Sequence, residues 1–571
     1  MKSKATKIAA WTVLGAAAIL VVVLGILRIH LDSAFLEEVL NNALVPASKG
    51  TYRVELGDLS YSILGGDMVV RELRVLPVRA TIDSLSESGA APAVQFSARL
   101  REVSIHDVEV LRLLWRRELV AERFSVSSPL VQIIANEIER GTEEADLDSL
   151  DTQTEDESAL ATTSEYLEDL RYLEIGHVEI DHVDASLIVV GPSGQDRNET
   201  SLTNRVSNLS FRLENLIIDP TRPQDLKRIA FANDARIDFD RLHLELPKER
   251  ILEIGPFSSS TLDESIQVGS VRISPTYSED ELLQGSGPDG DRIELTTGPI
   301  AFEGLDFRRA FSQLRFYARL AHVESFDIRV LSDKHRSAPQ PESKTPAPMP
   351  HDVFRELPFP VTVDSIRFAD ASVTYSERST KAQAPGRISI SDIDALVTGL
   401  SNDPTVASAE SPARLTSSAR LFDSVRTGID IDIPLLAPPP TMSVRATFEG
   451  FDPVLANPML QPLEGMRVTK GEVDTAWVDI QYGPQAATGS VVVVYRDLDV
   501  RMEDRETGKQ NFGDKLGSIF ADVGLRGGND PDPGERPRSG KVDYEIKLEK
   551  PFFQLFWEAI RSGLVDLVMR F

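Results

Sequence analysis

Histidines readily bind metal ions or carry protons, and the chain has eight of them. Only His177 and His182 lie close together, five residues apart in a predicted strand. Because side chains alternate between the faces of a strand, we expect these two on opposite faces and no shared metal site. The chain contains no cysteine, which excludes disulfides, thiolate zinc sites and cysteine nucleophiles.

Two segments match ligand-binding loops only superficially. Residues 285–290 fit GxGxxG, but no hydrophobic strand precedes them and no helix follows, so we expect a turn. The acidic run 143–157 lacks the glycine and the closing glutamate of a calcium loop, which favours a solvated linker. No GxSxG elbow or SxxK pair has a setting that fits a nucleophile. We therefore expect no cofactor and no enzyme activity.

The charge of the chain limits its partners. Lys plus Arg is 61 and Asp plus Glu is 89, which gives a net charge of −28. Phosphate backbones repel such a chain, and no basic stripe offsets the repulsion, so we expect no nucleic acid partner. A polybasic lipid-binding face is equally unsupported.

The longest apolar run predicts a membrane anchor. Residues 8–27 carry no charge, and about 20 helical residues cross the ~30 Å hydrocarbon core. Lys2, Lys4 and Lys7 precede the run and Arg28 follows it, so the N-terminal tail is the more basic flank. The positive-inside rule predicts a single-pass anchor with a cytoplasmic N-terminus.

A cleaved signal peptide is the alternative to the anchor. Its apolar core is shorter and ends at small residues, whereas here the small residues 15–18 lie in the middle of the run. The uncleaved anchor is therefore favoured. A large extracytoplasmic body without disulfides suits a bacterial envelope better than a eukaryotic secretory route.

After a short amphipathic helix predicted for residues 30–44, the residue pattern of the chain is typical of a β protein. Short runs of alternating apolar and polar residues predict strands with one apolar face. The connections look too short for crossovers, so the expected fold class is mainly β with antiparallel meanders.

Weak internal repeats occur in this body. Residues 175–180 read Ile-x-x-Val-x-Ile and are followed by Asp-Ala-Ser, and residues 363–372 show a similar order. Residues 100–133 and 305–330 also share a strand, a Leu- or Phe-rich turn and two further strands. Repeated β units predict an elongated sheet, although chance recurrence of a β pattern is an alternative.

Polar stretches divide the chain into segments, with a further turn-rich loop expected at 527–540. The expected segments are a tail and anchor at 1–29, β segments at 30–136, 166–331 and 353–550, an acidic linker at 137–165, a Pro-rich linker at 332–352 and a terminal helix at 551–571.

The terminal segment predicts an amphipathic helix with an unusually broad apolar stripe. One interpretation is a helix that docks on the end of the sheet. The other is contact with a membrane surface or a partner protein. The candidate contact residues are Phe552, Phe553, Phe556, Trp557, Ile560 and Leu564.

Several of these features resemble the AsmA-like family of bacterial envelope proteins. The resemblance begins with the anchor and continues through residues 36–75, where a short helix leads into a strand, a Leu-Gly turn at Leu64 and another strand. The Leu113-Leu114 pair with Leu119 and Pro129 is placed as in that family, and residues 489–571 fit its C-terminal pattern.

This resemblance implies an elongated, curled antiparallel β-sheet, or β-groove, fixed at the inner membrane, that takes part in phospholipid transport or outer-membrane biogenesis. Burying acyl chains on an apolar face gains about 25 cal/mol per Å². About 25 strands at ~4.8 Å spacing give a sheet on the order of 120 Å long, so an envelope protein partner is expected at its distal end. The candidate groove-lining residues are Val178, Ile180, Leu187, Val189, Val363, Ile366, Phe368 and Val373.

Alternation of apolar residues does not distinguish an open groove from a closed core. A structural or interaction scaffold with its apolar faces sealed as a β-sandwich therefore remains an alternative to lipid conduction.

Overall fold

The computed structural model describes residues 50–87, 94–136, 171–190, 202–219, 228–335, 354–407, 411–436, 441–502, 526–547 and 552–568, with short gaps inside some ranges, together with Glu37, Glu38, Asn41 and Ser48. The predicted anchor 8–27, its flanking residues Lys2, Lys4, Lys7 and Arg28, and the acidic linker 137–165 lie outside these residues. Among the described residues, no helix is both long and apolar enough to cross a bilayer.

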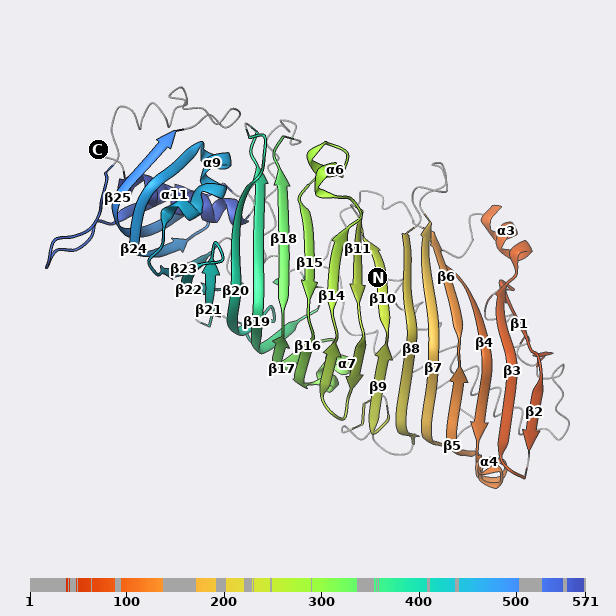
Figure 1. Cartoon of the computed structure of the whole chain (residues 1–571). Helices are drawn as coiled ribbons and strands as arrows, with labels where there is room; N and C mark the ends of the chain where they lie inside the picture. The colour runs from red at the N-terminus through yellow and green to blue at the C-terminus, as the bar shows by residue number, and fades with distance from the viewer. Residues whose placement is uncertain are drawn as a thin grey trace. The chain divides into compact units, whose positions relative to one another are not determined.

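Strands dominate the described chain, which confirms the prediction of a mainly β protein (Figure 1). The chain divides into two compact units: Met1–Leu246 with Glu253–Glu264, and Pro247–Leu252 with Ser265–Phe571. This division falls inside the predicted middle segment 166–331. The Pro-rich linker was predicted to start at 332, but a strand continues to Asp333.

The first unit contains most of the N-terminal strands. Its elements are β1 Tyr52–Glu55, β2 Leu59–Ser62, β3 Asp67–Pro77, α3 Arg79–Glu87, β4 Val94–His106, α4 Val110–Arg116, β5 Glu118–Ser127, β6 Leu130–Asn136, β7 Tyr172–Val190, β8 Leu202–Ile218, β9 Asp234–Phe239, β10 Arg241–Leu246 and β12 Phe257–Ser260. Strand β11 Arg250–Ile254 lies across the division between the units.

The second unit continues with strands and ends in a helix. Its elements are β13 Ser265–Val268, β14 Val271–Pro275, α6 Glu279–Leu283, β15 Arg292–Thr297, β16 Ile300–Leu305, α7 Phe307–Gln313, β17 Phe316–Val323, β18 Phe326–Asp333, β19 Val361–Arg378, β20 Gly386–Ser401, β21 Ala413–Leu421, β22 Val425–Ile433, β23 Met442–Phe448, η2 Pro453–Ala456, α9 Asn457–Glu464, β24 Met466–Tyr482, β25 Ala486–Met502, β26 Gly540–Glu545 and α11 Phe552–Val568.

The sheet in each unit is mixed, so the predicted antiparallel pairing is confirmed only in part. β7 pairs in parallel with both β5 and β6, and β19 pairs in parallel with both β17 and β18. Parallel neighbours need a crossover of a dozen or more residues. The long polar stretches before β7 and β19 supply that length, although the sequence suggested only linkers there.

The predicted internal repeat is confirmed by the strand registers. Helices α4 and α7 follow corresponding strands with an offset of 197 residues at both ends. Leu119 of β5 lies beside Leu173 of β7, and Phe316 of β17 lies beside Val361 of β19, which preserves the same offset for the first strand of each pair. Chance alternation does not reproduce such a register, so the two units contain a duplicated arrangement.

β-Bulges interrupt the alternation at matching positions of the two copies. The register shifts between Ile180 and Val183 in β7 and between Phe368 and Ala371 in β19. Two residues then separate neighbours on the apolar face. The bulge invalidates the period-two argument that placed His177 and His182 on opposite faces. His182 sits at the bulge with φ 58° and contacts Asn208 of β8 at 2.6 Å.

In each unit, a helical side chain hydrogen-bonds to backbone groups on the free edge of one outermost strand. The side chain of Asn41 accepts from the Val54 N–H at 2.8 Å and donates to its C=O at 2.9 Å, on β1. On β26, the Lys541 N–H donates to Asp566 of α11 at 2.7 Å. Unpaired strand edges promote aggregation, and these contacts cover them.

Candidate functional site

The apolar face of the sheet is the feature most able to bind a ligand. Residues directly opposite each other in the register lie on the same face of a sheet. In the first unit such paired positions are apolar on several neighbouring strands, so the apolar face is continuous across them. Several of its members are almost fully buried: Met68, Val70, Ile105, Leu119, Phe124 and Ile175. Bulges keep these residues on one side although their spacing alternates between two and three.

The residues predicted to line a groove in the first unit lie on this face of β7. Val178 is buried, whereas Ile180 and Leu187 are partly exposed. Val189 is on the same strand, opposite Leu202 of β8, but its side chain is outside the described part of the chain. Strict alternation would separate Ile180 from Leu187, and the bulge between them restores a common face.

The corresponding prediction in the second unit has the same geometry. Val363 is buried, and Ile366, Phe368 and Val373 are partly exposed on the apolar face of β19. The structure therefore brings each predicted set together within its own unit.

The face in the second unit continues with partly exposed aliphatic side chains. Val373 lies opposite Ile390 on β20, and Leu415 on β21 lies opposite Ile431 on β22. We call this surface the aliphatic face. Its partly exposed members include Ile366, Phe368, Val373, Ile388, Ile390, Ile393, Val397, Ile429, Ile431 and Ile433.

The opposite face of the strands carries charges in pairs. Arg99 on β4 contacts Glu72 on β3 at 2.8 Å, and Arg414 on β21 contacts Asp432 on β22 at 2.7 Å. The bond from Arg414 holds the pKa of Asp432 below its ordinary value. Exposed pairs of this kind add about 0–1 kcal/mol each. Their main consequence is that the charge is confined to one face and the other stays apolar.

One cleft lies on this charged face of the first unit. It has a volume of about 500 Å³ and includes Arg74, Arg99, Arg205, Asp184 and Leu130 in its lining. Leu76, Ala98, Val131 and Ala185 also line it, so the cleft combines charged and apolar side chains.

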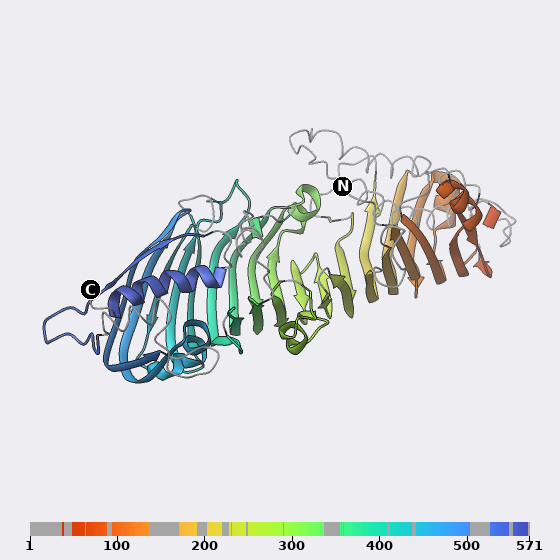
Figure 2. The same ribbon diagram turned by 90° about the horizontal axis from the view of Figure 1, so that it is seen from above.

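The C-terminal helix covers the apolar face at β25 and β26 (Figure 2). Leu555 and Ala559 are buried in a cluster with Val444 and Ile480. The predicted helix is thus confirmed over Phe552–Val568, and its packing favours the interpretation of a helix docked on the sheet.

The candidate contact residues of this helix are engaged inside the molecule. Phe556, Ile560 and Leu564 pack against the apolar cluster, and the Trp557 indole donates to Glu464 of α9 at 3.1 Å. The side chains of Phe552 and Phe553 are not among those described. Glu464 also accepts from Arg561 at 2.9 Å, which ties α9 to α11.

Helix α11 approaches the sheet at two glycines. A Cβ at Gly563 would lie 2.8 Å from a methyl of Val491 and 2.9 Å from a methyl of Val542. A Cβ at Gly540 on β26 would overlap the Gly563 carbonyl oxygen. This contact leaves no room for a ligand between α11 and the strands beneath it.

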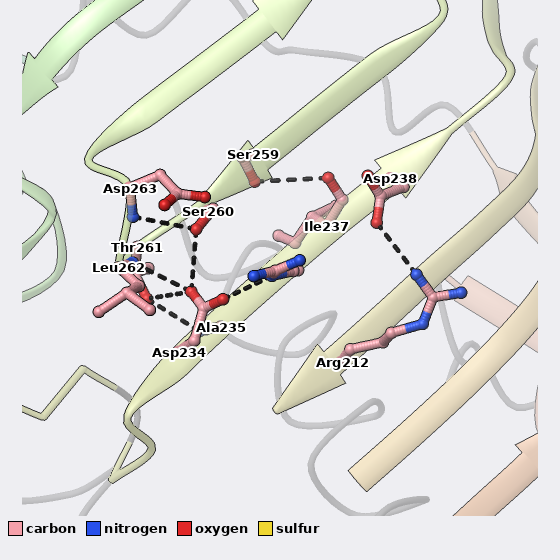
Figure 3. A network of polar contacts seen from close by, with 11 residues as sticks. Arg212, Asp234, Ala235, Ile237, Asp238, Ser259, Ser260, Thr261, Leu262 and Asp263 are labelled. Atoms are coloured by element: carbon pink, nitrogen blue, oxygen red, sulfur yellow. Dashed lines mark hydrogen bonds and ion pairs between the residues drawn. The ribbon is translucent and has the colours of Figure 1, made fainter. Parts of the chain in front are cut away.

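A buried carboxylate in the first unit is the strongest polar feature there. Asp234 is completely buried and accepts from Arg236 at 2.5 Å, the Leu262 amide at 3.0 Å and Ser260 at 3.1 Å (Figure 3). Burial alone raises its pKa, but these hydrogen bonds outweigh burial and hold the pKa below the ordinary 3.8. The Thr261 hydroxyl donates to Oδ1 of Asp234 at 3.2 Å.

This network stabilises the fold. Both oxygens of Asp234 are bonded within the fold, and the carboxylate fixes the turn after β12. Asp333 with Arg378 and Asp403 with Arg315 repeat the arrangement in the second unit. Within the described ranges, no group of histidine and acidic side chains could hold a metal ion.

Sequence reasoning missed these buried pairs. Asp234 lies 26 residues from Ser260, and no local pattern links them. The expectation that residues 285–290 form a turn fits the structure, because Gly285 follows α6 in a turn with φ 87°. No protein-family model and no curated protein sequence matches this chain.

Proposed function

We propose that this chain is an inner-membrane-anchored periplasmic protein of the AsmA-like type, in which a hydrophobic β-groove holds lipid acyl chains during phospholipid transport or outer-membrane biogenesis. In this proposal residues 8–27 are the single anchor and the N-terminus is cytoplasmic. A further envelope protein receives lipid at the end distant from the anchor. Lipid moves passively, so no catalytic residue, metal or cofactor is required.

The observation that carries the proposal is the partly exposed aliphatic face of the second unit. Ile390 and Ile431 lie on strands whose opposite face carries ion pairs such as Arg414–Asp432. When acyl chains bind to such a face, apolar surface of both the lipid and the protein is removed from water. Partly exposed aliphatic side chains have more surface left for a ligand to cover than fully buried ones.

Adjacent residues of β20 allow a direct test. Ile393 is partly exposed on the aliphatic face, whereas Asp394 is exposed on the other side of the same strand. A photo-cross-linking amino acid placed at Ile393 in the full chain, in membranes containing labelled phospholipid, is expected to capture lipid. The same amino acid at Asp394 is the matched control.

Lipid capture at Ile393 alone, with phospholipid found by mass spectrometry after gentle extraction, is the expected result. Equal labelling at both positions, or no lipid at either, would contradict an acyl-chain site on this face. Folding of both variants is checked by circular dichroism.

The second candidate function is an envelope scaffold with a sealed core. It is favoured by the C-terminal part of the second unit, where Val444 and Ile480 are fully shielded and α11 covers the face. If the whole aliphatic face is sealed in the same way, a hydrophobic dye finds no binding surface and Ile393 captures no lipid. The same experiment therefore separates the two functions.

A further inference from the structure

One end of the first unit's sheet exposes a group of large apolar side chains. Helix α4 buries Leu113 against the unit but exposes 64% of Leu111 and 81% of Trp115. Leu114 and, on the turn between β2 and β3, Leu64 are also exposed. We call Leu64, Leu111, Leu114 and Trp115 the rim patch.

The backbone joins the two parts of the rim patch. The Val108 N–H, just before α4, donates to the Gly66 carbonyl at 2.9 Å, beside the turn that carries Leu64. A Cβ at Gly66 would lie within 2.4 Å of the Val108 carbonyl oxygen. The turn and α4 therefore lie together at one end of the strands, where β2 ends and β5 begins (Figure 1).

Arginines lie beside the rim patch although the chain has a net charge of −28. Residues 110–117 carry Arg112, Arg116 and Arg117, flanked by Glu109 and Glu118. Glu109 pairs with Arg112 at 2.9 Å, so we assign the contact with anionic lipid to Arg116, next to Trp115. Trp beside Leu and Arg is the composition of segments that lie in the headgroup region of a bilayer. Anionic lipid headgroups complement the arginines.

The residues before β1 give the direction of the predicted anchor. Glu37 accepts from the Leu56 N–H at 3.0 Å, and Asn41 is bonded to Val54. Traced toward the N-terminus, from Asn41 to Glu37, the chain therefore follows the sheet edge from Val54 toward Leu56. The same direction continues along β2 to the turn at 64–66, because β1 and β2 pair with successive parts of β3.

The distance left to the anchor is short. Six residues separate Leu56 from Ser62 at the end of β2, about 20 Å at ~3.3 Å per residue. The nine residues 28–36 between the predicted anchor and Glu37 span ~14 Å as a helix or ~30 Å when extended. These lengths bracket the distance to the rim patch.

From this direction, length and charge we propose that the rim patch inserts into the surface of the anionic bilayer that holds the anchor. Trp115 and the leucines enter the headgroup boundary, and Arg116 meets lipid phosphates. The contact holds the sheet end against the lipid surface. This inference rests on the proposed anchor, so its test measures anchoring separately.

The cysteine-free chain is suited to single-site labelling. Leu114→Cys on the rim patch carries an environment-sensitive fluorophore, and Leu130→Cys is the control. Leu130 is an equally accessible leucine, 52% exposed, but it lies on β6 away from the rim. The full-length variants are reconstituted into liposomes of phosphatidylcholine with or without phosphatidylglycerol, and retention after an alkaline wash reports the anchor.

The expected result is a blue shift at Leu114→Cys and quenching by a lipid-borne quencher, strongest with phosphatidylglycerol and reduced by Arg116→Glu. Leu130→Cys is expected to respond to aqueous iodide instead. Retained protein whose two labels behave alike would overturn the rim contact and leave the anchor intact. Equal lipid quenching without phosphatidylglycerol would overturn the anionic surface. Loss of the protein in the wash would overturn the anchor itself.

Discussion

At the scale of single residues, stability depends on a few buried polar groups, some of which are fully hydrogen-bonded and some of which are not. Asp234, Asp333 and Asp403 are buried carboxylates with arginine partners, and the pKa of each is held below its ordinary value against the effect of burial. Tyr482 is the opposite case: it is 3% exposed, and its hydroxyl has no hydrogen-bond partner among the described residues.

Asp234→Ala is expected to cost about 2 kcal/mol at neutral pH, because the Leu262 amide and Ser260 lose their buried acceptor. A carboxyl with a lowered pKa in the folded state stabilises the fold above its unfolded pKa of about 3.8. That contribution disappears as the pH falls through the folded pKa. Urea unfolding should therefore show a difference between wild type and variant at pH 7 that shrinks below about pH 4. A difference that does not change with pH would contradict the assignment.

Tyr482→Phe is expected to be neutral or to stabilise the protein by up to about 1 kcal/mol, because it removes a buried hydroxyl without a partner. Tyr495→Phe is the control. That hydroxyl, in an equally buried ring, donates to the Arg526 carbonyl at 3.1 Å, so its removal should cost about 1 kcal/mol. Thermal unfolding of the two variants compares them directly, and destabilisation by Tyr482→Phe would indicate a bonded hydroxyl.

At the scale of secondary-structure elements, the bulged strands and the docked helix determine which faces are apolar. His182 and Asp370 occupy equivalent bulge positions of the two copies with φ 58° and 49°. Side chains branched at Cβ are strained in this left-handed region, whereas asparagine tolerates it.

His182→Val is expected to destabilise the first unit by about 1–2 kcal/mol relative to His182→Asn. Both substitutions remove the ring contact with Asn208, so the difference isolates the backbone conformation. Denaturant titration of the pair measures it. Equal stability would show that the bulge does not constrain this residue.

Gly563→Ala is expected to weaken the packing of α11 on the sheet, because the added methyl would lie within 2.9 Å of Val491 and Val542. Overpacking of this kind costs about 1–3 kcal/mol. Val491→Ala opens space at the same point, so the double variant should be more stable than the sum of the two single changes predicts. Additive effects would contradict a direct clash.

The sequence permitted the prediction of the main elements but not of their pairing. Alternation revealed the strands around Val178 and Val363, and a broad apolar stripe revealed α11. Parallel pairing of β7 with β5 was hidden, because a strand's own pattern does not record the direction of its neighbour. The bulge at His182 was hidden because one extra residue looks like an irregular pattern. The candidate lining residues were found, whereas the Asp234 network was missed, since its partners are distant in sequence.

At the scale of the whole molecule, the chain combines an apolar face with devices that limit association. Ion pairs occupy the opposite face, and α11 covers both the apolar cluster and the edge of β26. A net charge of −28 adds repulsion between copies.

Truncation after Lys550 is expected to convert the protein into an associating species. The deletion uncovers Val444 and Ile480 and leaves the Lys541 N–H without its acceptor. Exposed apolar faces and open strand edges both promote self-association. Light scattering and binding of a hydrophobic dye measure the change. A monomeric variant without dye binding would show that α11 is dispensable for covering the sheet.

The repeated arrangement of the two copies has a consequence for how such a protein changes over evolution. Each copy carries its own helix, parallel pair and bulges in one register, so a whole copy is a self-consistent building block. Inserting or removing a whole block keeps the strand neighbours inside each copy, whereas adding one strand through a hairpin would reverse the direction of the strands that follow it. Such a sheet would therefore lengthen by whole blocks of strands.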